Sequence, residues 1–437
     1  DGKTSIRGGY GMFYEHTNGN EGNTEGLEGS PPLVLTSTQY NIVGYTNIGG
    51  SGGVAFPLSP RSIPTQAVWP YVQQWNLNIQ RELMKGTVLT VAYVGSKGTH
   101  LGLESDINQL VPITQAQNPY QPGQTMTAAD CSNGTANGVT PTGPAAIQFN
   151  IACGGDPDPY RPFRGFGDIT AIQYVANSNY NALQISLRRH VGRLSFDLAY
   201  TWSHSLDDSS DYGDSNFVNS YNYANNYASS AFDQRHILNL GYVYDLPLFT
   251  GPGLMHKILG GWQITGLFTY QTGTPFSVTD SLYGAGVGNG IGTGAYLNLV
   301  GNPYSAPNAP AGLPGVFGPL LYNPAAFAAP EGLTFGTAPR NVLNNPSRWN
   351  LDSGLFKQFA FTEHKTLEFR AEGFNVLNHT QWLPLGGNNS TGNSSTSCFA
   401  GPNNSAGDPS CLANSDFLRP GGAHNPRILQ LGMKFLF

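Results

Sequence analysis

The sequence predicts an all-β protein, an antiparallel transmembrane β-barrel, on three observations. Apolar and polar side chains alternate in segments of about ten residues, as in strands with one face toward lipid and the other toward a wet lumen. Short and long connections follow each other in turn, as at the two rims of an outer-membrane barrel. Only 11% of the residues are charged, against roughly 25% in soluble globular proteins. No apolar stretch reaches the roughly 18 residues of a helical membrane span.

The clearest alternation lies in residues 194–204. One face carries Leu194, Phe196, Leu198, Tyr200 and Trp202, and the other carries Ser195, Asp197, Ala199, Thr201 and Ser203. The last segment repeats the pattern with Leu429, Leu431, Met433, Phe435 and Phe437 on one face. Because a barrel is a single sheet whatever its length, we expect residues 1–437 to form one domain.

We predict about ten strands, each with boundaries uncertain by two to four residues. Their spans are 4–14, 68–82, 87–96, 178–190, 194–204, 234–246, 261–274, 348–359, 365–377 and 427–437. Trp202 and Trp349 fall toward the long-loop ends of their strands, and Trp262 falls toward a short-turn end. These positions fit the aromatic belts at the two membrane interfaces, although ordinary sheet packing explains any one tryptophan equally well.

The connections are predicted to be extracellular where they are long. Shorter joins span 83–86, 191–193, 247–260 and 360–364, and long ones span 15–67, 97–177, 205–233, 275–347 and 378–426. The four cysteines fall in long connections as two local pairs, Cys131 with Cys153 and Cys398 with Cys411. In an oxidising compartment such pairs form disulfides, so we expect two loop disulfides, with free or metal-binding thiols as the alternative.

The N-terminus and the net charge of the chain give two further expectations, one about missing sequence and one about partners. The chain begins at Asp1 without an initiator methionine or a leader, so we expect an N-terminal part to be missing. The net charge of -6 is spread without a basic stripe, which excludes nucleic acid as an expected partner.

Five segments resemble the barrel of Oar-like TonB-dependent receptors. They are PYVQQWNLNIQREL (70–83), NYNALQISLRRH (179–190), AYTWSHSLDD (199–208), FDQRHILNLGYVYDLP (232–247) and GFNVLNHTQW (373–382). The resemblance implies an N-terminal plug, a segment that engages TonB, and a plugged barrel of about 22 strands in the outer membrane. The chain would then be the C-terminal part of such a barrel, in contact with outer-membrane lipid, and would reach TonB only through the missing N-terminal part.

Charged residues on the polar faces are candidates for the lumen. Glu368, Arg370 and Glu372 share one face of a strand, and Arg188, Asp197 and Lys434 have the same polar phase. We expect the three residues on the first strand to be lumen charges that face water or a plug. The other three could pair with a plug or line a passage, and structural pairing is the favoured interpretation for them. Glu368 and Glu372 are four residues apart, about 13 Å along a strand. This separation exceeds that of the two carboxylates of a glycosidase.

Loop 205–233 is the best candidate for contact with an extracellular ligand. Its carboxylates and tyrosines include Asp207, Asp208, Asp211, Tyr212, Asp214, Tyr221, Tyr223 and Tyr227. Tyrosines stack on sugars or peptides, and carboxylates bind Ca²⁺, but the spacing does not match a calcium loop. The same composition is also ordinary for a large wet loop.

Other chemistry is not predicted. The histidines lack zinc-binding spacing, and GAGVGNGIGTG (284–294) lacks the Lys-Ser/Thr ending of a nucleotide loop. We therefore expect no enzyme, no metal and no cofactor. The leading hypothesis is a receptor that imports a scarce nutrient, either a siderophore, an oligosaccharide or a peptide. The alternatives are a structural or adhesive barrel, a passive porin of about ten strands, and a soluble β-sandwich or secreted enzyme.

Overall fold

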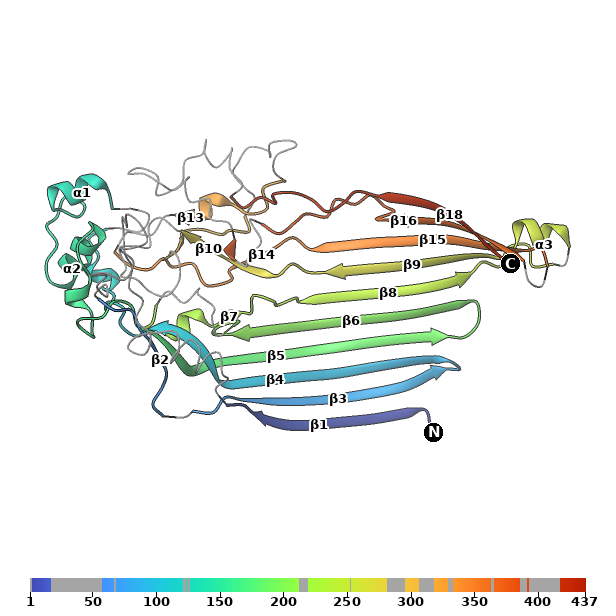
Figure 1. Ribbon diagram of the computed structural model, residues 1–437, viewed down its shortest axis with the longest axis horizontal. Coiled ribbons are helices and arrows are strands. Elements are labelled where there is room, and N and C mark those ends of the chain that lie inside the picture. The colour runs from blue at the N-terminus through green and yellow to red at the C-terminus, as the bar shows by residue number, and fades with distance from the viewer. Residues whose placement is uncertain are drawn as a thin grey trace, which may run out of the picture.

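The computed structural model describes residues 2–16, 57–66, 68–120, 124, 126–211, 219–251, 253–280, 295–305, 318–328, 333–362, 365–385, 391–392 and 417–437. A large, mainly antiparallel sheet dominates these residues (Figure 1). Its ten long strands, in spatial order, are β1 (Thr4–Tyr14), β3 (Tyr71–Met84), β4 (Thr87–Asp106), β5 (Thr170–His190), β6 (Leu194–Asp207), β8 (His236–Asp245), β9 (Trp262–Gln271), β15 (Arg348–Ala360), β16 (Thr366–Phe374) and β18 (Ile428–Leu436). Short strands β2 (Arg61–Ser62) and β7 (Ala228–Ser229) pair with β5 and β6.

Each predicted span overlaps one long strand, and long strands that follow one another in the sequence are neighbours in the sheet, so the predicted antiparallel sheet is confirmed. The sheet is open. Among the described residues β1 pairs only with β3 and β18 pairs only with β16, and these two strands lie at opposite edges in Figure 1. The ten strands therefore form an open wall, which is the arrangement expected of part of a larger barrel.

The register gives the wall two different faces. Leu198 is paired with Leu240 on one face, and the next residues, Ala199 and Asn239, are paired on the other. Because partners in an antiparallel pair lie on the same side, following these pairs across the sheet extends each face over all ten long strands. The apolar face is exposed in the structure, with Leu431 75% exposed, as expected for a surface that contacts lipid.

The two ends of the wall differ. The short connections and helix α3 (Leu254–Leu259) lie at the end where the C-terminus lies, and helices α1 (Ala128–Asn133) and α2 (Pro144–Ala152) lie at the opposite end with the long connections (Figure 1). We refer to the described parts of the connections β4–β5, β6–β8, β9–β15 and β16–β18 as the loop assembly. No helix in the described part of the chain is long and apolar enough to cross a membrane.

The predictions for β4 and β5 were too short. Both strands continue beyond the predicted ends at 96 and 178, past an irregularity between Gly98 and Leu101. The added arms bury Leu103 and Ala176, against which Tyr223 of the β6–β8 connection packs. Tyr223 belongs to a distant segment, so the local sequence pattern of β4 and β5 does not predict this contact.

The loop assembly has cores of its own. One cluster includes Phe276, Phe327 and Leu343, which are almost fully buried, around small strands of the β9–β15 connection. These strands are β10 (Pro275–Asp280), β11 (Ala295–Tyr296), β12 (Asn298–Leu299), β13 (Phe327–Ala328) and β14 (Leu343–Asn344), with β17 (Thr391–Gly392) paired to β10. A second cluster unites Phe149 of α2 with Leu333 from the β9–β15 connection.

A disulfide joins Cys131 to Cys153 beside this second cluster. It closes a loop with a sequence separation of 22 residues. The other predicted pair, Cys398 and Cys411, lies outside the described residues.

Candidate functional site

The six predicted lumen residues lie on the same face of the wall, the polar one. Cross-strand pairs place Arg188 opposite Asp197 and Glu368 opposite Lys434. Arg370 and Glu372 share the phase of Glu368 on β16. The register from β6 through β8, β9 and β15 to β16 connects the two groups. We call this surface the polar face.

Charged side chains on the polar face pair with one another near the short-connection end. Asp197 Oδ1 forms an ion pair with Arg188 Nε at 3.6 Å, and it lies 3.3 Å from His190 Nε2. Both Arg188 and Asp197 are more than half exposed, so this pair contributes little to stability. On β16 the Arg370 guanidinium pairs with Glu368, whose carboxylate also accepts from the Gln358 side-chain amide at 3.1 Å. The structural pairing favoured for Arg188 and Asp197 is therefore present, and Glu368 and Arg370 pair as well. Within the described part of the chain, neither Lys434 nor Glu372 forms an ion pair.

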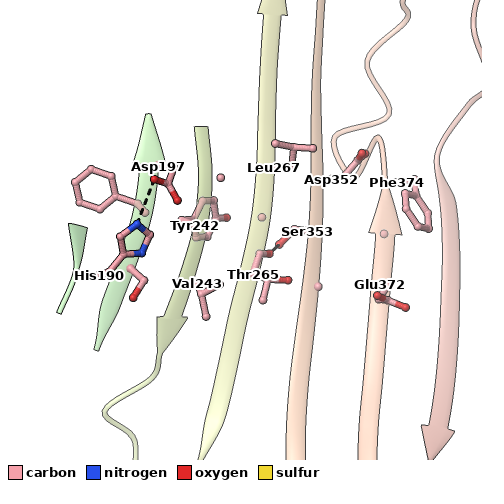
Figure 2. A pocket seen from close by; sticks show the side chains of 16 residues that line it. His190, Asp197, Tyr242, Val243, Thr265, Leu267, Asp352, Ser353, Glu372 and Phe374 are labelled. Carbon is pink, nitrogen blue, oxygen red and sulfur yellow. Dashed lines mark hydrogen bonds and ion pairs between the residues drawn. The ribbon is translucent and has the colours of Figure 1, made fainter. Parts of the chain in front are cut away.

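A hollow of about 470 Å³ lies on the wall between β6 and β16 (Figure 2). Its lining comes from five neighbouring strands, β6, β8, β9, β15 and β16, together with His190 at the end of β5. The carboxylates of Asp197, Asp352 and Glu372 contribute acidic groups, and Leu267 and Phe374 contribute apolar surface. The hollow can thus accept a cationic or hydrogen-bond-donating surface with some apolar content.

Small residues in β8 and β15, the two strands that flank β9, explain why the wall is hollowed here. Gly241 and Gly354 belong to the polar face through their partners Leu267 and Thr265. A Cβ atom on Gly241 would meet open space, whereas one on Gly354 would press against the ring of Phe356. Because glycine has no side chain, Gly241 leaves space open in the hollow, and Gly354 leaves room for the Phe356 ring to lie over the strand.

Asp352 was missed in the sequence analysis, although its position carries a signal. It follows Asn350 by two residues in β15, so the two residues share the polar phase of the strand. The Asp352 Oδ1 atom accepts from the Asn350 side-chain amide at 2.7 Å and from the Asn375 backbone N–H at 2.8 Å. These two donors hold the carboxylate at the rim of the hollow. The described residues contain no group of three or more His, Cys, Asp or Glu side chains arranged to hold a metal ion.

The predicted ligand-contact residues have mixed surroundings. The Asp208 carboxylate is buried and accepts from the Asn177 backbone N–H at 2.7 Å, and burial raises its pKa above the ordinary value. The Tyr221 hydroxyl donates to the Gln109 carbonyl at 2.7 Å, and the Tyr223 hydroxyl donates to the Gln173 side chain at 3.0 Å. These three residues hold the β6–β8 connection against the β4–β5 arms.

Three members of this set are exposed, namely Asp211, Tyr227 and, in spite of its hydrogen bond, Tyr221. Tyr212 and Asp214 lie outside the described residues. Among the described members of the set, the surface available to a ligand is therefore smaller than the sequence suggested. Contact with a ligand stays a prediction.

Buried ion pairs in the loop assembly link connections that are distant in sequence. The Arg340 guanidinium pairs with Asp207 while both side chains are almost fully buried, and Arg340 Nε donates to the Asn226 carbonyl at 3.2 Å. The sequence suggested Asp207 as a ligand contact. In the structure its ion pair with Arg340 instead joins the β6–β8 and β9–β15 connections. Because the partners are 133 residues apart, spacing alone could not have paired them.

A second buried cluster lies at the tip of the β4 and β5 arms, where the β4–β5 connection begins. Asp106 accepts from the backbone N–H groups of Asn108 at 2.8 Å and Ile169 at 2.9 Å. Burial raises the pKa of Asp106 to about 6, in spite of these hydrogen bonds. Arg161 lies nearby and binds the Asp168 carboxylate at 2.7 Å. The cluster fixes the start of the β4–β5 connection.

Solved outer-membrane proteins resemble the chain at low sequence identity. The pyoverdine outer membrane receptor FpvA from Pseudomonas aeruginosa PAO1 is 9% identical, with 100% of this chain and 34% of that chain covered and a TM-score of 0.40. The siderophore receptor PirA from Acinetobacter baumannii is 10% identical, with 100% and 39% covered and a TM-score of 0.39. The outer membrane transporter YddB from Escherichia coli is 11% identical, with 87% and 34% covered and a TM-score of 0.37. The chain therefore spans between 34% and 39% of the length of these proteins.

Family membership rests on the sequence match and agrees with the two-faced wall. No curated protein matches the chain. The family described as outer membrane beta barrel domain matches residues 1–419, which is nearly the whole chain. The alternation of an exposed apolar face with a polar face is the pattern expected of such a domain. The chain thus belongs to the outer-membrane β-barrel family, and its location is the bacterial outer membrane.

Proposed function

We propose that the chain forms part of the wall of a TonB-dependent receptor that imports a scarce nutrient across the outer membrane. In this proposal residues 1–437 are the C-terminal part of a single barrel domain, and a plug and the TonB-binding segment belong to the N-terminal part of the same protein. The polar face lines the lumen. The nutrient is a siderophore, an oligosaccharide or a peptide.

The observation that carries the proposal is the hollowed, charged polar face. A hollow of about 470 Å³ lined by Asp197, Asp352 and Glu372 offers hydrogen-bond acceptors to a surface inside the lumen. A plug with donors at matching positions would satisfy these carboxylates, and release of such contacts would open a path along the wall. The residues Arg188, Glu368, Arg370 and Lys434 belong to the same surface in this account.

The loop assembly supports capture of a ligand from outside. Its buried cores and the Cys131–Cys153 disulfide give it a defined shape, and ordered loops lose less conformational entropy on binding than flexible ones. Asp211 and Tyr227 remain exposed on it. In the proposal they contact the ligand together with Tyr212 and Asp214, while Asp208, Tyr221 and Tyr223 hold the surface in place.

Growth on defined nutrients tests the proposal. Strains with and without the gene, and with and without TonB, are grown with ferric siderophores as the iron source, oligosaccharides as the carbon source, or peptides as the nitrogen source. We expect one nutrient class to require both the gene and TonB. A class that needs the gene without TonB would identify a passive porin. Growth that never depends on the gene would favour a structural or adhesive barrel.

Residue-level variants then test the hollow. Asp197→Asn with Glu372→Gln removes two carboxylates of similar size without changing side-chain volume. We expect uptake of the identified nutrient to change at least tenfold while receptor abundance in the outer membrane stays the same. Asp156→Asn, an exposed change in the loop assembly, is the matched control and should leave uptake unchanged. Equal uptake in all three proteins would remove the hollow from the mechanism.

A further inference from the structure

The longest of the short connections contains a cluster of exposed apolar side chains. Helix α3 lies in it, beyond the ends of the strands at the short-connection end (Figure 1). Met255 is 66%, Ile258 51% and Leu259 40% exposed. Positions 255, 258 and 259 have the spacing of a single helix face. Leu248, which precedes the helix, is also exposed.

A lysine contact shows on which side of the wall this connection lies. Lys357 has the phase of Leu355 and Phe359, which is the apolar, lipid-facing phase of β15. Its ammonium group donates to the carbonyl of Gly260, the residue that follows α3. The C-terminal end of α3 is therefore fastened to the lipid side of the wall and not to the polar face.

Aromatic rings surround the same lysine. The Lys357 Nζ atom lies 5.4 Å from the ring centre of Trp262 and 4.8 Å from that of Phe359. The Trp262 ring in turn packs edge-on against Phe369 with centres 6.2 Å apart. Tryptophan and lysine side chains of this kind mark the level of the lipid headgroups. This places the end of α3 at the membrane interface near the short-connection rim.

We propose that α3 and its flanks are an interfacial anchor that lies on the phospholipid surface at this rim. The apolar face formed by Met255, Ile258 and Leu259 enters the boundary between headgroups and acyl chains, continuous with the apolar face of the wall. Lys257, which is exposed, lies on the opposite, polar side of the helix and faces the headgroup and water side of the interface. Burial of apolar side chains in the interface stabilises a helix of six residues that is too short to persist alone in water.

The anchor has a mechanical consequence for the wall. It fastens the β8–β9 hairpin, whose strands line the hollow, to the membrane surface. When a nutrient moves along the polar face, this hairpin would then stay in place relative to the lipid. The proposal predicts that α3 contacts lipid. It does not predict that α3 is a stable helix by itself.

Photo-crosslinking tests the anchor directly. The gene product that contains this chain is purified from outer membranes and reconstituted in vesicles of phosphatidylethanolamine and phosphatidylglycerol. A small fraction of the lipid carries a diazirine near the glycerol. Mass spectrometry then locates the labelled residues. We expect strong labelling of 248–260, together with labelling of the apolar face of β18 as an internal sign of insertion.

Met255→Asp with Ile258→Asp should lower labelling of 248–260 at least tenfold and leave β18 labelling unchanged. Val139→Asp, an exposed apolar position in the loop assembly, is the matched control and should change neither. The proposal is overturned if β18 is labelled in the unsubstituted protein while 248–260 is not. It is equally overturned if the double variant is labelled at 248–260 as strongly as the original protein.

Discussion

The wall and the loop assembly are built from the same chain but stabilised differently. In the wall, the pair of Arg188 with Asp197 is more than half exposed, and large apolar side chains such as Leu431 face outward. In the loop assembly, Arg340 and Asp207 form an ion pair that is almost fully buried, and Phe327 lies in a closed core. The wall relies on backbone pairing and on lipid, whereas the loop assembly has an interior like that of a soluble domain. Substitutions should therefore lower stability strongly and locally in the loop assembly, and they should change stability only weakly on the polar face.

The largest effect is expected from Arg340→Met. The substitution leaves the Asp207 carboxylate buried without its cation, which costs about 3 to 5 kcal/mol for pairs of this kind. Hydrogen exchange of residues 205–211 should accelerate at least a hundredfold, since the connection loses its link to the β9–β15 segment. Adding Asp207→Asn to the same protein should restore part of the protection. Unchanged exchange in Arg340→Met would show that the buried pair does not hold the connections together.

Loss of the disulfide ranks next. Replacing both Cys131 and Cys153 by serine frees a loop with a sequence separation of 22 residues. The chain-entropy cost is about 3 kcal/mol. We expect limited proteolysis to cut within 107–169 much faster, while the strands of the wall stay intact. Equal cleavage rates in the two proteins would mean that the core around Phe149 suffices without the bridge.

The pH response of the β4–β5 connection should be smaller. The pKa of Asp106 is raised to about 6 from the ordinary 3.8, so the folded connection binds a proton more tightly than the unfolded one. The resulting stability is fully present below pH 4 and is lost as the pH rises through 6, by no more than about 3 kcal/mol. Exchange protection of the Asn108 and Ile169 amides, corrected for intrinsic rate, should fall over this range. Asp106→Asn should flatten the profile, and an equally steep profile in that variant would assign the effect to another group.

The smallest effect is expected on the polar face. Arg188→Ala removes an exposed partner of Asp197 and should change stability by less than about 1 kcal/mol. The urea midpoint of the reconstituted protein measures this change. A loss as large as that of Arg340→Met would erase the distinction between the two regions.

The strands of the wall could be predicted from the sequence because their alternating pattern depends only on residues close together in the chain. Alternation at a period of two identifies both the strands and their faces, and it placed Asp197 and Glu372 in the polar phase. Asp352 could have been found in the same way. The arms of β4 and β5, the partner of Asp207 and the cores around Phe276 and Phe149 depend on residues more than a hundred positions away, which no local pattern reports. Helix α3 was hidden inside a predicted turn because six residues are too few for a periodic signal.

The central claim is that consecutive residues of the wall alternate between lipid and a wet lumen. Single nitroxide labels at Leu238, Asn239, Leu240 and Gly241 of β8, in the reconstituted protein, test it through collision with oxygen, which favours lipid, and with a water-soluble nickel chelate. The account predicts that labels at 238 and 240 collide mainly with oxygen and labels at 239 and 241 mainly with the chelate. Equal accessibility at all four positions, or the reverse alternation, would contradict it.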